Sequence, residues 1–217
     1  MNEVQRSKII LKILNRIYPK TPIPLKHRNK FTLLVSVLLS AQTTDVNVNN
    51  VTKSIYPKHN KPEHFVKLGR KKIERLIKSI GIYRVEAKSV YFLSKQLIEK
   101  HKGKVPETFE ELEKLPGVGH KTASVVMSQG FGHSAFPVDT HIHRLAQRWG
   151  LTNGKTVVQT EKDLKRLFPK KFWNKLHLQI IYYGREYCKA RECYGLTCKI
   201  CTTCYPKRKS PIKTKKA

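Results

Sequence analysis

The sequence predicts an all-α protein, and three observations support this prediction. Apolar residues recur at helical spacing in one segment after another, no segment alternates as a half-buried strand does, and no internal repeat or low-complexity core is present. Proline and glycine separate the periodic segments, as expected of turns between helices. The 217 residues are enough for one large domain or two small ones, and a chain of this length can bury most of its apolar surface.

In the N-terminal half, the first helix carries an apolar face of isoleucines and Leu14 and ends before the break at Thr21–Pro24. Residues 31–39 are apolar on almost every side, which predicts a buried central helix. The next helix begins at Thr43 or Thr44 and ends before Pro57. Three further helices are expected at 62–68, 71–79 and 84–101, the last with Val85, Val90, Phe92, Leu93 and Leu97 facing inward.

In the C-terminal half, a helix is expected directly after the turn Pro116–Gly119, followed by helices at 140–149, 157–167 and 172–187. The tail at residues 205–217 contains lysine and arginine but no acidic residue, which predicts disorder. Such a tail either keeps the protein in solution or contacts phosphates without sequence preference.

The charge of the chain predicts an anionic partner. Forty-four Lys and Arg residues stand against 15 Asp and Glu, a formal net charge of +29, and a field of this sign attracts polyanions. Nucleic acid is the first candidate, and an anionic membrane surface is the second. Insertion into a membrane is not expected, because the longest apolar run, Leu33–Leu39, is far shorter than the roughly 20 residues that span a bilayer. The first residues lack the apolar stretch of a secretory signal, so we expect a cytoplasmic, nucleoid-associated protein.

The stretch Leu115–Ala123, with the sequence LPGVGHKTA, predicts a turn that binds an anion. Pro116 ends one helix, and Gly117 and Gly119 allow a tight turn with bare backbone before the next helix begins. The free amides and the positive end of the helix dipole then face one point, which suits a phosphate. Such a turn would contact a nucleic-acid backbone rather than read bases. The alternative is an ordinary corner between helices, in which glycine is present for steric reasons only.

Lys121, in the first turn of that helix, is a candidate nucleophile. A helix N-terminus disfavours a cation, which favours the neutral amine that a nucleophile requires. The alternative is a surface lysine that touches phosphate. Asp139 is the expected N-cap of the next helix. The connection 131–138 can stretch to roughly 26 Å, which is enough to return Asp139 to the starting end of the Lys121 helix, across a cleft from it.

All five cysteines lie between Cys188 and Cys204. A disulfide framework would spread them along the chain, so this crowding predicts a metal or cluster site. His141 and His143 are poor candidates for a shared metal, because residues two apart point to different faces of a helix.

Together these segments resemble the endonuclease III family of helix-hairpin-helix DNA glycosylases. Leu115–Ala123 resembles the family's helix-hairpin-helix, and Val138–His141 resembles its aspartate motif. Leu39–Asp45 and Ile80–Tyr83 are similar to two further family segments, and the motifs follow the family order. The similarity extends from near residue 5 to about residue 204.

This resemblance implies a two-lobed, all-α helix-hairpin-helix glycosylase fold. A six-helix barrel that contains the hairpin would occupy residues 22–133. A second lobe, with an iron–sulfur cluster, would combine residues 1–21 with residues 134–204, and residues 205–217 would form the basic tail. The protein would act as a monomer on double-stranded DNA that contains damaged bases or abasic sites, bound in a cleft between the lobes.

The resemblance also implies a chemistry. The family removes oxidised pyrimidines and cuts the strand 3′ to the abasic site by β-elimination, as a bifunctional DNA N-glycosylase and AP lyase of base excision repair. By resemblance, Lys121 takes the place of the Schiff-base lysine and Asp139 that of the catalytic aspartate. Gln42 matches the residue that enters the gap left by a flipped base, and Ile82 matches an apolar wedge nearby. Further DNA contacts are expected from Gly117, Val118, Gly119, His141, Lys189 and Arg191.

Two of these assignments, and one further match to a family position, have simpler alternatives. Gln42 could be a polar residue before a helix, Ile82 a core contact, and Asp45, which also matches a family position, a helix cap.

The cysteine loop departs from the family pattern Cys-x6-Cys-x2-Cys-x5-Cys, which no four of the five cysteines reproduce. Cys188, Cys198, Cys201 and Cys204 come closest, and three cysteines at x2 spacing resemble the ligands of a [4Fe–4S] cluster. We therefore expect a structural [4Fe–4S] cluster on these four residues, with Cys193 as a spare thiol able to displace Cys188 or Cys204. A zinc site and a loop without metal are the alternatives.

Two other functions remain to be distinguished. A sister glycosylase that acts on adenine in mismatches shares the hairpin, the aspartate and the cluster but lacks the lysine and the lyase step. A non-enzymatic DNA-binding module with a zinc-type knuckle would need only the charge and the turn. Lys121, Asp139 and Gln42 together favour the bifunctional enzyme.

Overall fold

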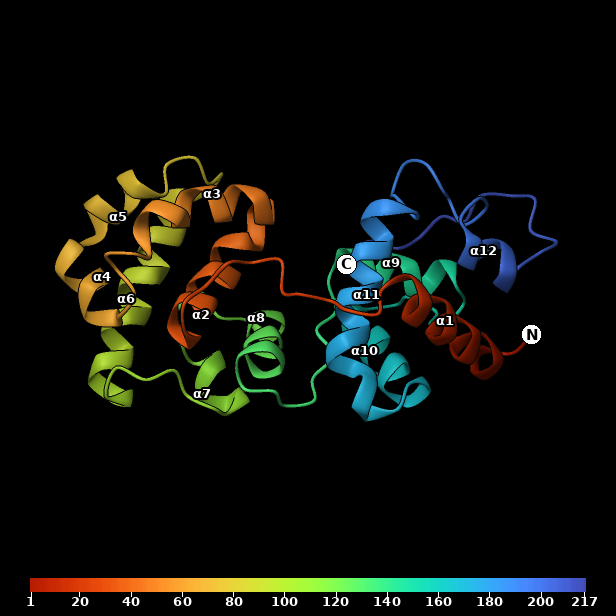
Figure 1. Ribbon diagram of the computed structural model, residues 1–217, viewed down its shortest axis with the longest axis horizontal. Helices are drawn as coiled ribbons and strands as arrows, with labels where there is room; N and C mark the ends of the chain where they lie inside the picture. Colours follow the sequence, from red (N-terminus) through yellow and green to blue (C-terminus); the bar gives the residue numbers. More distant parts are fainter. The chain divides into compact units, whose positions relative to one another are not determined.

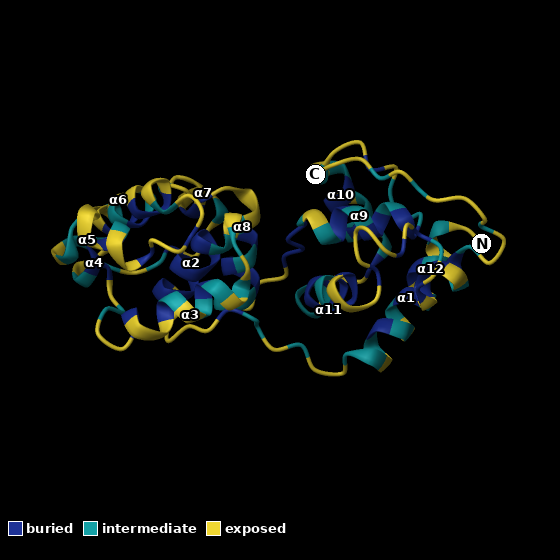
Figure 2. Cartoon of the chain, turned by 90° about the horizontal axis from the view of Figure 1, so that it is seen from above, coloured by how far each residue is buried: buried dark blue, intermediate teal, exposed yellow.

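The computed structural model describes all 217 residues, and every regular element in it is a helix. The helices form two compact units, each with its own apolar core (Figure 1). The central unit comprises Ile23–His133, and the terminal unit combines Met1–Pro22 with Ser134–Ala217. Figure 2 shows the buried residues gathered inside each unit. None of the helices has both the length and the apolar character needed to cross a membrane.

The central unit is built around α2 (Lys30–Leu39), whose residues from Phe31 to Leu39 are all buried. This confirms the predicted central helix. Asn29 caps it, because its side chain accepts a hydrogen bond from the backbone N–H of Thr32. The other helices of this unit are α3 (Asp45–Ile55), α4 (Pro62–Leu68), α5 (Arg70–Leu76), α6 (Tyr83–His101), α7 (Phe109–Glu113) and α8 (His120–Val125), the last continued by a π-helical turn (Val126–Gly130).

The terminal unit joins the two ends of the chain. Its helices are α1 (Glu3–Ile17), α9 (Thr140–Arg148), α10 (Val157–Leu167), α11 (Trp173–Glu186) and α12 (Lys199–Cys204). The Trp149 and Tyr183 rings meet edge to face in its core, 5.7 Å apart, and both side chains are fully buried. The five cysteines are part of the same core.

The predicted helices at 62–68 and 157–167 begin and end where the structure places α4 and α10. The sequence did not predict α12, and it indicated α7 only as the helix that Pro116 ends, without bounds, because both are too short to show a helical period. The inward orientation predicted for two residues of α6 is wrong: Val85 is 60% exposed and Phe92 is 41% exposed. The buried stripe of α6 consists of Ala87, Val90, Leu93 and Leu97, and at 3.6 residues per turn the other two lie off this stripe.

The disorder of the basic tail stays a prediction. In the structure the tail contacts the terminal unit through several hydrogen bonds. Arg208 donates to the carbonyl oxygens of Arg148 and Gly195, at 2.9 and 3.0 Å, and the Lys215 N–H donates to the side chain of Gln147 at 2.8 Å.

One carboxyl of the central unit is buried without compensation. Glu86, in the first turn of α6, is 6% exposed. Burial raises the pKa of its carboxyl to about 7, and no neighbouring cation opposes this effect. The folded protein therefore holds this proton to a higher pH than the unfolded chain does.

Glu86→Gln is expected to stabilise the protein above neutral pH. Because the pKa is higher in the folded state, the contribution of the neutral carboxyl is complete below pH 4.5 and is lost as pH rises through about 7. At about 1.36 kcal/mol per pKa unit, the wild type should lose up to about 3 kcal/mol between pH 5 and 8 through this group. Glutamine, which does not ionise, should remove that loss in urea unfolding. The control is Glu99→Gln, which removes an exposed carboxylate that pairs with Lys95. A pH dependence of stability that is unchanged in Glu86→Gln would contradict the raised pKa of Glu86.

Candidate active site

Apolar side chains anchor the hairpin between α7 and α8 in the core, while the glycine backbone of its turn is exposed. Leu112, Leu115 and Val118 are buried in the core of the central unit, and backbone hydrogen bonds of 3.0 Å close the turn from Leu115 to Leu112 and from Val118 to Leu115. The backbone at Gly117 and Gly119 is exposed. Of the residues predicted to contact DNA here, Val118 is 6% exposed, so its side chain is not available to DNA.

The two glycines of the turn are present for different reasons. Gly117 has a φ of 79°, and a Cβ there would lie 2.8 Å from the Cβ of Ser89 on α6, so both the backbone and the packing require glycine. Gly119 has an extended backbone, and a Cβ there would meet nothing within 4 Å. Steric need therefore explains Gly117 but not Gly119, and the absent side chain at Gly119 leaves the amides of the following turn open to a ligand.

Lys121 lies in the first turn of α8, with an exposed side chain. Gly119 is the N-cap of this helix and provides no side-chain cap, so the first amides lack an acceptor within the helix. The neighbouring His120 is held by Glu113, at 2.7 Å, and stacks on Phe109 with ring centres 5.7 Å apart. The start of α8 is thus fixed in place, while Lys121 is left exposed beside open amides.

The predicted wedge residues lie on adjoining loops of the central unit. Gln42 ends a 3-10 turn (Ser40–Gln42) and is exposed. Ile82 is 40% exposed at the start of α6, which argues against a core contact. A Cβ at Gly81 would lie 3.7 Å from the Gln42 carbonyl oxygen, so the two loops are neighbours. The helix after Gln42 is capped by the Thr44 side chain, which accepts from the Asn47 N–H at 3.2 Å, so the cap is not Asp45.

Asp139 is the N-cap of α9, as predicted. Its Oδ1 accepts a hydrogen bond of 2.8 Å from the Ile142 N–H, while Val138 and Ile142 on either side of it are buried in the core of the terminal unit. One carboxylate oxygen therefore orients the residue, and the other is not needed for the cap. His143 is buried and bonded to Thr160, at 2.8 Å, whereas the His141 Nδ1 lies 3.2 Å from the Arg144 guanidinium. The two histidines face different partners, as their spacing indicates.

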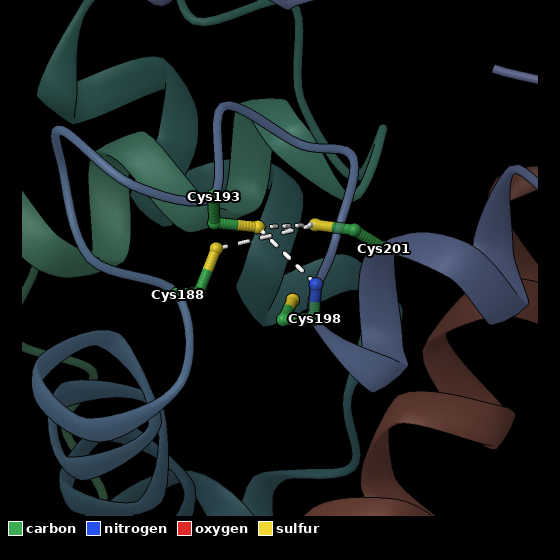
Figure 3. Close-up of side chains that lie close together, drawn as sticks. All are labelled: Cys188, Cys193, Cys198 and Cys201. Carbon is green, nitrogen blue, oxygen red and sulfur yellow. Dashed lines mark hydrogen bonds between the residues drawn. The ribbon is translucent and has the colours of Figure 1, made fainter. Parts of the chain in front are cut away.

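Four cysteine side chains converge in the terminal unit (Figure 3). The sulfur atoms of Cys188, Cys193, Cys198 and Cys201 all lie within 4.8 Å of one another, and all four residues are buried. Cys201 Sγ is 4.0 Å from Cys188 Sγ and 3.9 Å from Cys193 Sγ. No cysteine forms a disulfide.

This group differs from the predicted one, because Cys193 belongs to it and Cys204 does not. Two residues after Cys193 have left-handed backbone, Tyr194 with φ 46° and Gly195 with φ 85°, and this sharp turn keeps Cys193 beside the other sulfurs. Cys201 and Cys204 lie on α12, and a regular helix separates them by one turn, about 4.5 Å along its axis. Cys204 is buried as well.

The donor set suits a thiolate-bound metal centre. Hydrogen bonds from the Cys188 and Cys201 thiols lower the pKa of Cys198, which favours the deprotonated form that a metal binds. A single zinc ion with bonds of about 2.3 Å would hold its sulfurs roughly 3.8 Å apart. A [4Fe–4S] cluster has an iron at each thiolate and needs a wider set, so these four sulfurs would have to spread to accept it. The residues fit a cluster in chemistry and burial.

Arg148 is a residue of this site that the sequence did not reveal. It is 2% exposed at the end of α9, and its guanidinium donates to the Cys188 Sγ at 3.3 Å and to the Lys189 and Ala190 carbonyl oxygens at 2.8 Å each. A buried cation of this kind stabilises thiolate charge and ties the cysteine loop to α9. An arginine in a basic chain gives no sequence signal for such a role.

The basic residues of the cysteine loop are accessible. Lys189 and Arg191 are exposed, and Lys189 pairs with Glu192 at 3.1 Å. The loop thus presents positive charge on the surface while its cysteines point inward.

Comparisons with known proteins agree with these features. Residues 35–170 match the family described as HhH-GPD superfamily base excision DNA repair protein. Endonuclease III of Bacillus subtilis (strain 168) is 40% identical over 205 residues, which cover 94% of this chain and 94% of that protein. Endonuclease III of Escherichia coli (strain K12) is 40% identical over 215 residues, which cover 98% of this chain and 100% of that protein.

A solved structure gives a similar match. The structure of a trapped endonuclease III–DNA covalent intermediate, an estranged-adenine complex, matches with a TM-score of 0.88 and 39% identity, over 92% of this chain and 94% of that chain. Since both the family match and the relatives cover most of the sequence, the chain belongs to the HhH-GPD superfamily of base excision DNA repair proteins and, within it, to the endonuclease III family.

Proposed function

We propose that this protein is a bifunctional DNA glycosylase and AP lyase, which removes oxidised pyrimidines from duplex DNA and cuts the strand 3′ to the abasic site. The observation that carries the proposal is the start of α8, where Lys121 is exposed beside uncapped amides and beside Gly119, a glycine that packing does not require. A solved relative that is 39% identical was trapped as a covalent intermediate with DNA, which supports a nucleophilic residue in this family.

The proposed chemistry assigns one step to each residue. The damaged nucleotide is flipped out of the duplex, which exposes C1′. Lys121 attacks C1′ as a neutral amine while the base departs, and Asp139 stabilises positive charge on the sugar and accepts a proton from the amine. The base leaves as an anion and takes up a proton from water. Asp139 returns its proton to O4′ as the C1′–O4′ bond breaks, which opens the sugar ring and leaves an iminium between C1′ and Lys121. This iminium acidifies the C2′ hydrogen, whose loss expels the 3′ phosphate by β-elimination. Asp139 can serve while it caps α9, because only its Oδ1 is bonded to Ile142.

The remaining predicted contacts would hold the DNA. Gln42 would enter the gap left by the flipped base, with Ile82 as the apolar wedge, and their exposure on adjoining loops supports this pairing. The amides at Gly117–Gly119 would bind a phosphate, and Lys189, Arg191 and His141 would add contacts from the terminal unit. The cysteines would hold a [4Fe–4S] cluster that fixes the basic loop and takes no part in the reaction.

A panel of duplexes tests the proposal. Each carries one oxidised pyrimidine, one abasic site, one adenine mismatch or no lesion, and base release is measured separately from strand cutting. We expect release and cutting on oxidised pyrimidines and cutting at the abasic site. Release of adenine without cutting would instead indicate the sister glycosylase, and binding without either reaction would indicate a DNA-binding module.

Binding to undamaged duplex should depend strongly on salt and little on sequence. Neutralising roughly 4 to 6 phosphates gives a slope of log affinity against log salt near −4 to −5. Fluorescence anisotropy over about 50 to 200 mM salt measures this slope, because log affinity falls linearly with log salt. A flat dependence would contradict binding through the basic surface.

A further inference from the structure

The outer face of α6 carries a groove that the proposed function does not use. A hollow of about 600 Å³ lies along this helix, lined by Val85, Phe92, Lys88 and Lys95 and reaching Pro116 of the hairpin. A second hollow, of about 430 Å³, is lined by Phe92, Tyr91, Arg70 and Lys71. The two share Phe92, so they adjoin at this residue.

A third hollow extends this surface over α4 and α5. It has a volume of about 370 Å³, is lined by Lys58, His59, His64, Lys67 and Lys72, and shares Leu68 with the second hollow. Figure 1 shows α4 and α5 packed beside α6 in the central unit. We call the three hollows together the α6 groove.

The α6 groove is strongly basic. Its only acidic lining residue is Glu99, which pairs with Lys95 at 3.6 Å, and Arg70 pairs with Glu74 at 3.1 Å. Lys67, Lys71 and Lys72 are exposed and have no acidic partner. Desolvation lowers the pKa of His59, and the nearby His64, Lys72 and Lys58 lower it further, as expected where positive charges gather without counterions. Such a surface attracts a polyanion.

An exposed aromatic ring lies in the middle of this charge. Phe92 is 41% exposed and meets the Tyr91 ring edge to face, with ring centres 5.3 Å apart. Its place between the first two hollows leaves one apolar platform flanked by lysines on both sides. A duplex keeps its bases stacked inside, whereas a single strand can lay a base on such a ring while its phosphates meet the lysines.

We propose that the α6 groove binds a single strand of nucleic acid, with a base stacked on Phe92 and phosphates on Lys67, Lys71 and Lys72. This binding goes beyond the proposed glycosylase activity and does not depend on it. Because the groove begins at Pro116, a strand that leaves the hairpin can continue into it.

Charge reversal tests the phosphate contacts. The groove variant carries Lys67→Glu, Lys71→Glu and Lys72→Glu, and the matched control carries Lys8→Glu, Lys12→Glu and Lys162→Glu, which are exposed lysines of α1 and α10. The probe is a fluorescein-labelled oligothymidylate of about 16 nucleotides, within the site sizes of single-strand binders. The groove variant should lose at least about tenfold in affinity, and its salt slope should fall by roughly 2 relative to the wild type, for three phosphates at about 0.7 each. An affinity and salt slope equal to those of the control would overturn the proposal.

Substitutions at Phe92 test whether the groove binds the bases of a single strand or only its phosphates. Phe92→Ala should weaken oligothymidylate binding by about five- to a hundredfold, while Phe92→Trp should retain it. Binding of undamaged duplex, and cutting of an abasic-site duplex, should stay within about twofold of the wild type. Unchanged strand affinity in Phe92→Ala, or an equal loss on duplex, would overturn the proposal. Cutting that is absent in the wild type would instead count against the lyase assignment alone.

Cross-linking keeps the test independent of the variants' folding. The wild-type protein is irradiated with an oligonucleotide that contains 5-iododeoxyuridine, and the attached peptide is sequenced. We expect attachment at Tyr91 or Phe92. Attachment confined to the hairpin peptide or to the terminal unit would refute the α6 groove as the binding site.

Discussion

Lys121→Gln is expected to abolish borohydride trapping and strand cutting while lesion binding stays nearly unchanged. If the Lys121 amine forms an imine with C1′, borohydride reduces it during turnover and leaves the protein covalently attached to damaged DNA. Glutamine has no nucleophilic amine, so neither the adduct nor the elimination can form. Only one positive charge is lost from a chain with a net charge of +29, so affinity should fall by little more than the share of one phosphate contact. Denaturing gels for the adduct and anisotropy for binding measure the two effects.

Asp139→Asn provides the partner measurement. Asparagine retains a side-chain oxygen that can accept the hydrogen bond that the Ile142 N–H donates to Asp139 Oδ1. The cap of α9, and with it the fold, should therefore persist. Base release should nevertheless fall by orders of magnitude, since removing a catalytic group commonly costs several kcal/mol and about 1.36 kcal/mol changes a rate tenfold. A matched control is Thr156→Ser at the N-cap of α10, which changes a cap of the same unit without touching the proposed chemistry.

The outcomes separate the candidate functions. A wild-type protein that releases damaged bases but is never trapped would refute the lyase assignment and leave the glycosylase assignment standing. A Lys121→Gln protein that is still trapped would place the nucleophile on another residue. The adenine-specific alternative predicts release without trapping, and the binding-module alternative predicts neither.

Local patterns predicted much of the fold because helices are periodic and their ends are marked. The almost wholly apolar run at 31–39 indicated a buried helix, and Asp139 caps α9 as its residue type indicates. Periodicity failed on α6, where apolar residues occur on two faces and only packing shows that Val85 and Phe92 remain exposed. The roles of Arg148 and Glu86 depend on burial, which arises from long-range packing and leaves no local pattern.

The hairpin was predictable and the cysteine group was not, because local sequence determines the backbone of the hairpin but not that of the cysteine loop. In the hairpin, proline and glycine determine the backbone within a few residues, so the sequence specifies the turn. Among the cysteines, the choice of ligands depends on how the loop after Cys188 bends. That bend places Tyr194 in the left-handed region, where a tyrosine is not expected, so Gly195 alone did not show how the loop turns. Spacing alone therefore favoured Cys204, and the three-dimensional turn favours Cys193.

Cys193→Ser is therefore expected to remove the bound metal, and Cys204→Ser to retain it. The purified wild type should be yellow-brown with about four iron atoms per chain if the site holds a [4Fe–4S] cluster. Because Cys193 Sγ lies 3.9 Å from Cys201 Sγ inside the converging group, serine there removes one of four ligands, whereas serine at Cys204 leaves all four. Metal binding contributes folding free energy, so Cys193→Ser should also lower the melting temperature of the terminal unit.

Two measurements on both variants decide the matter: metal content by elemental analysis and visible absorbance of the intact protein. Loss of iron in Cys204→Ser with retention in Cys193→Ser would restore the ligand set that spacing alone predicts. About one zinc per chain and no visible absorbance would show that the site holds a tetrahedral zinc ion rather than a cluster. Zinc holds its sulfurs roughly 3.8 Å apart, so the four cysteines would need little movement to bind it. Cys201→Ser is the positive control, because Cys201 belongs to the ligand set under either assignment, and it should lose the metal whichever of the other two residues is a ligand.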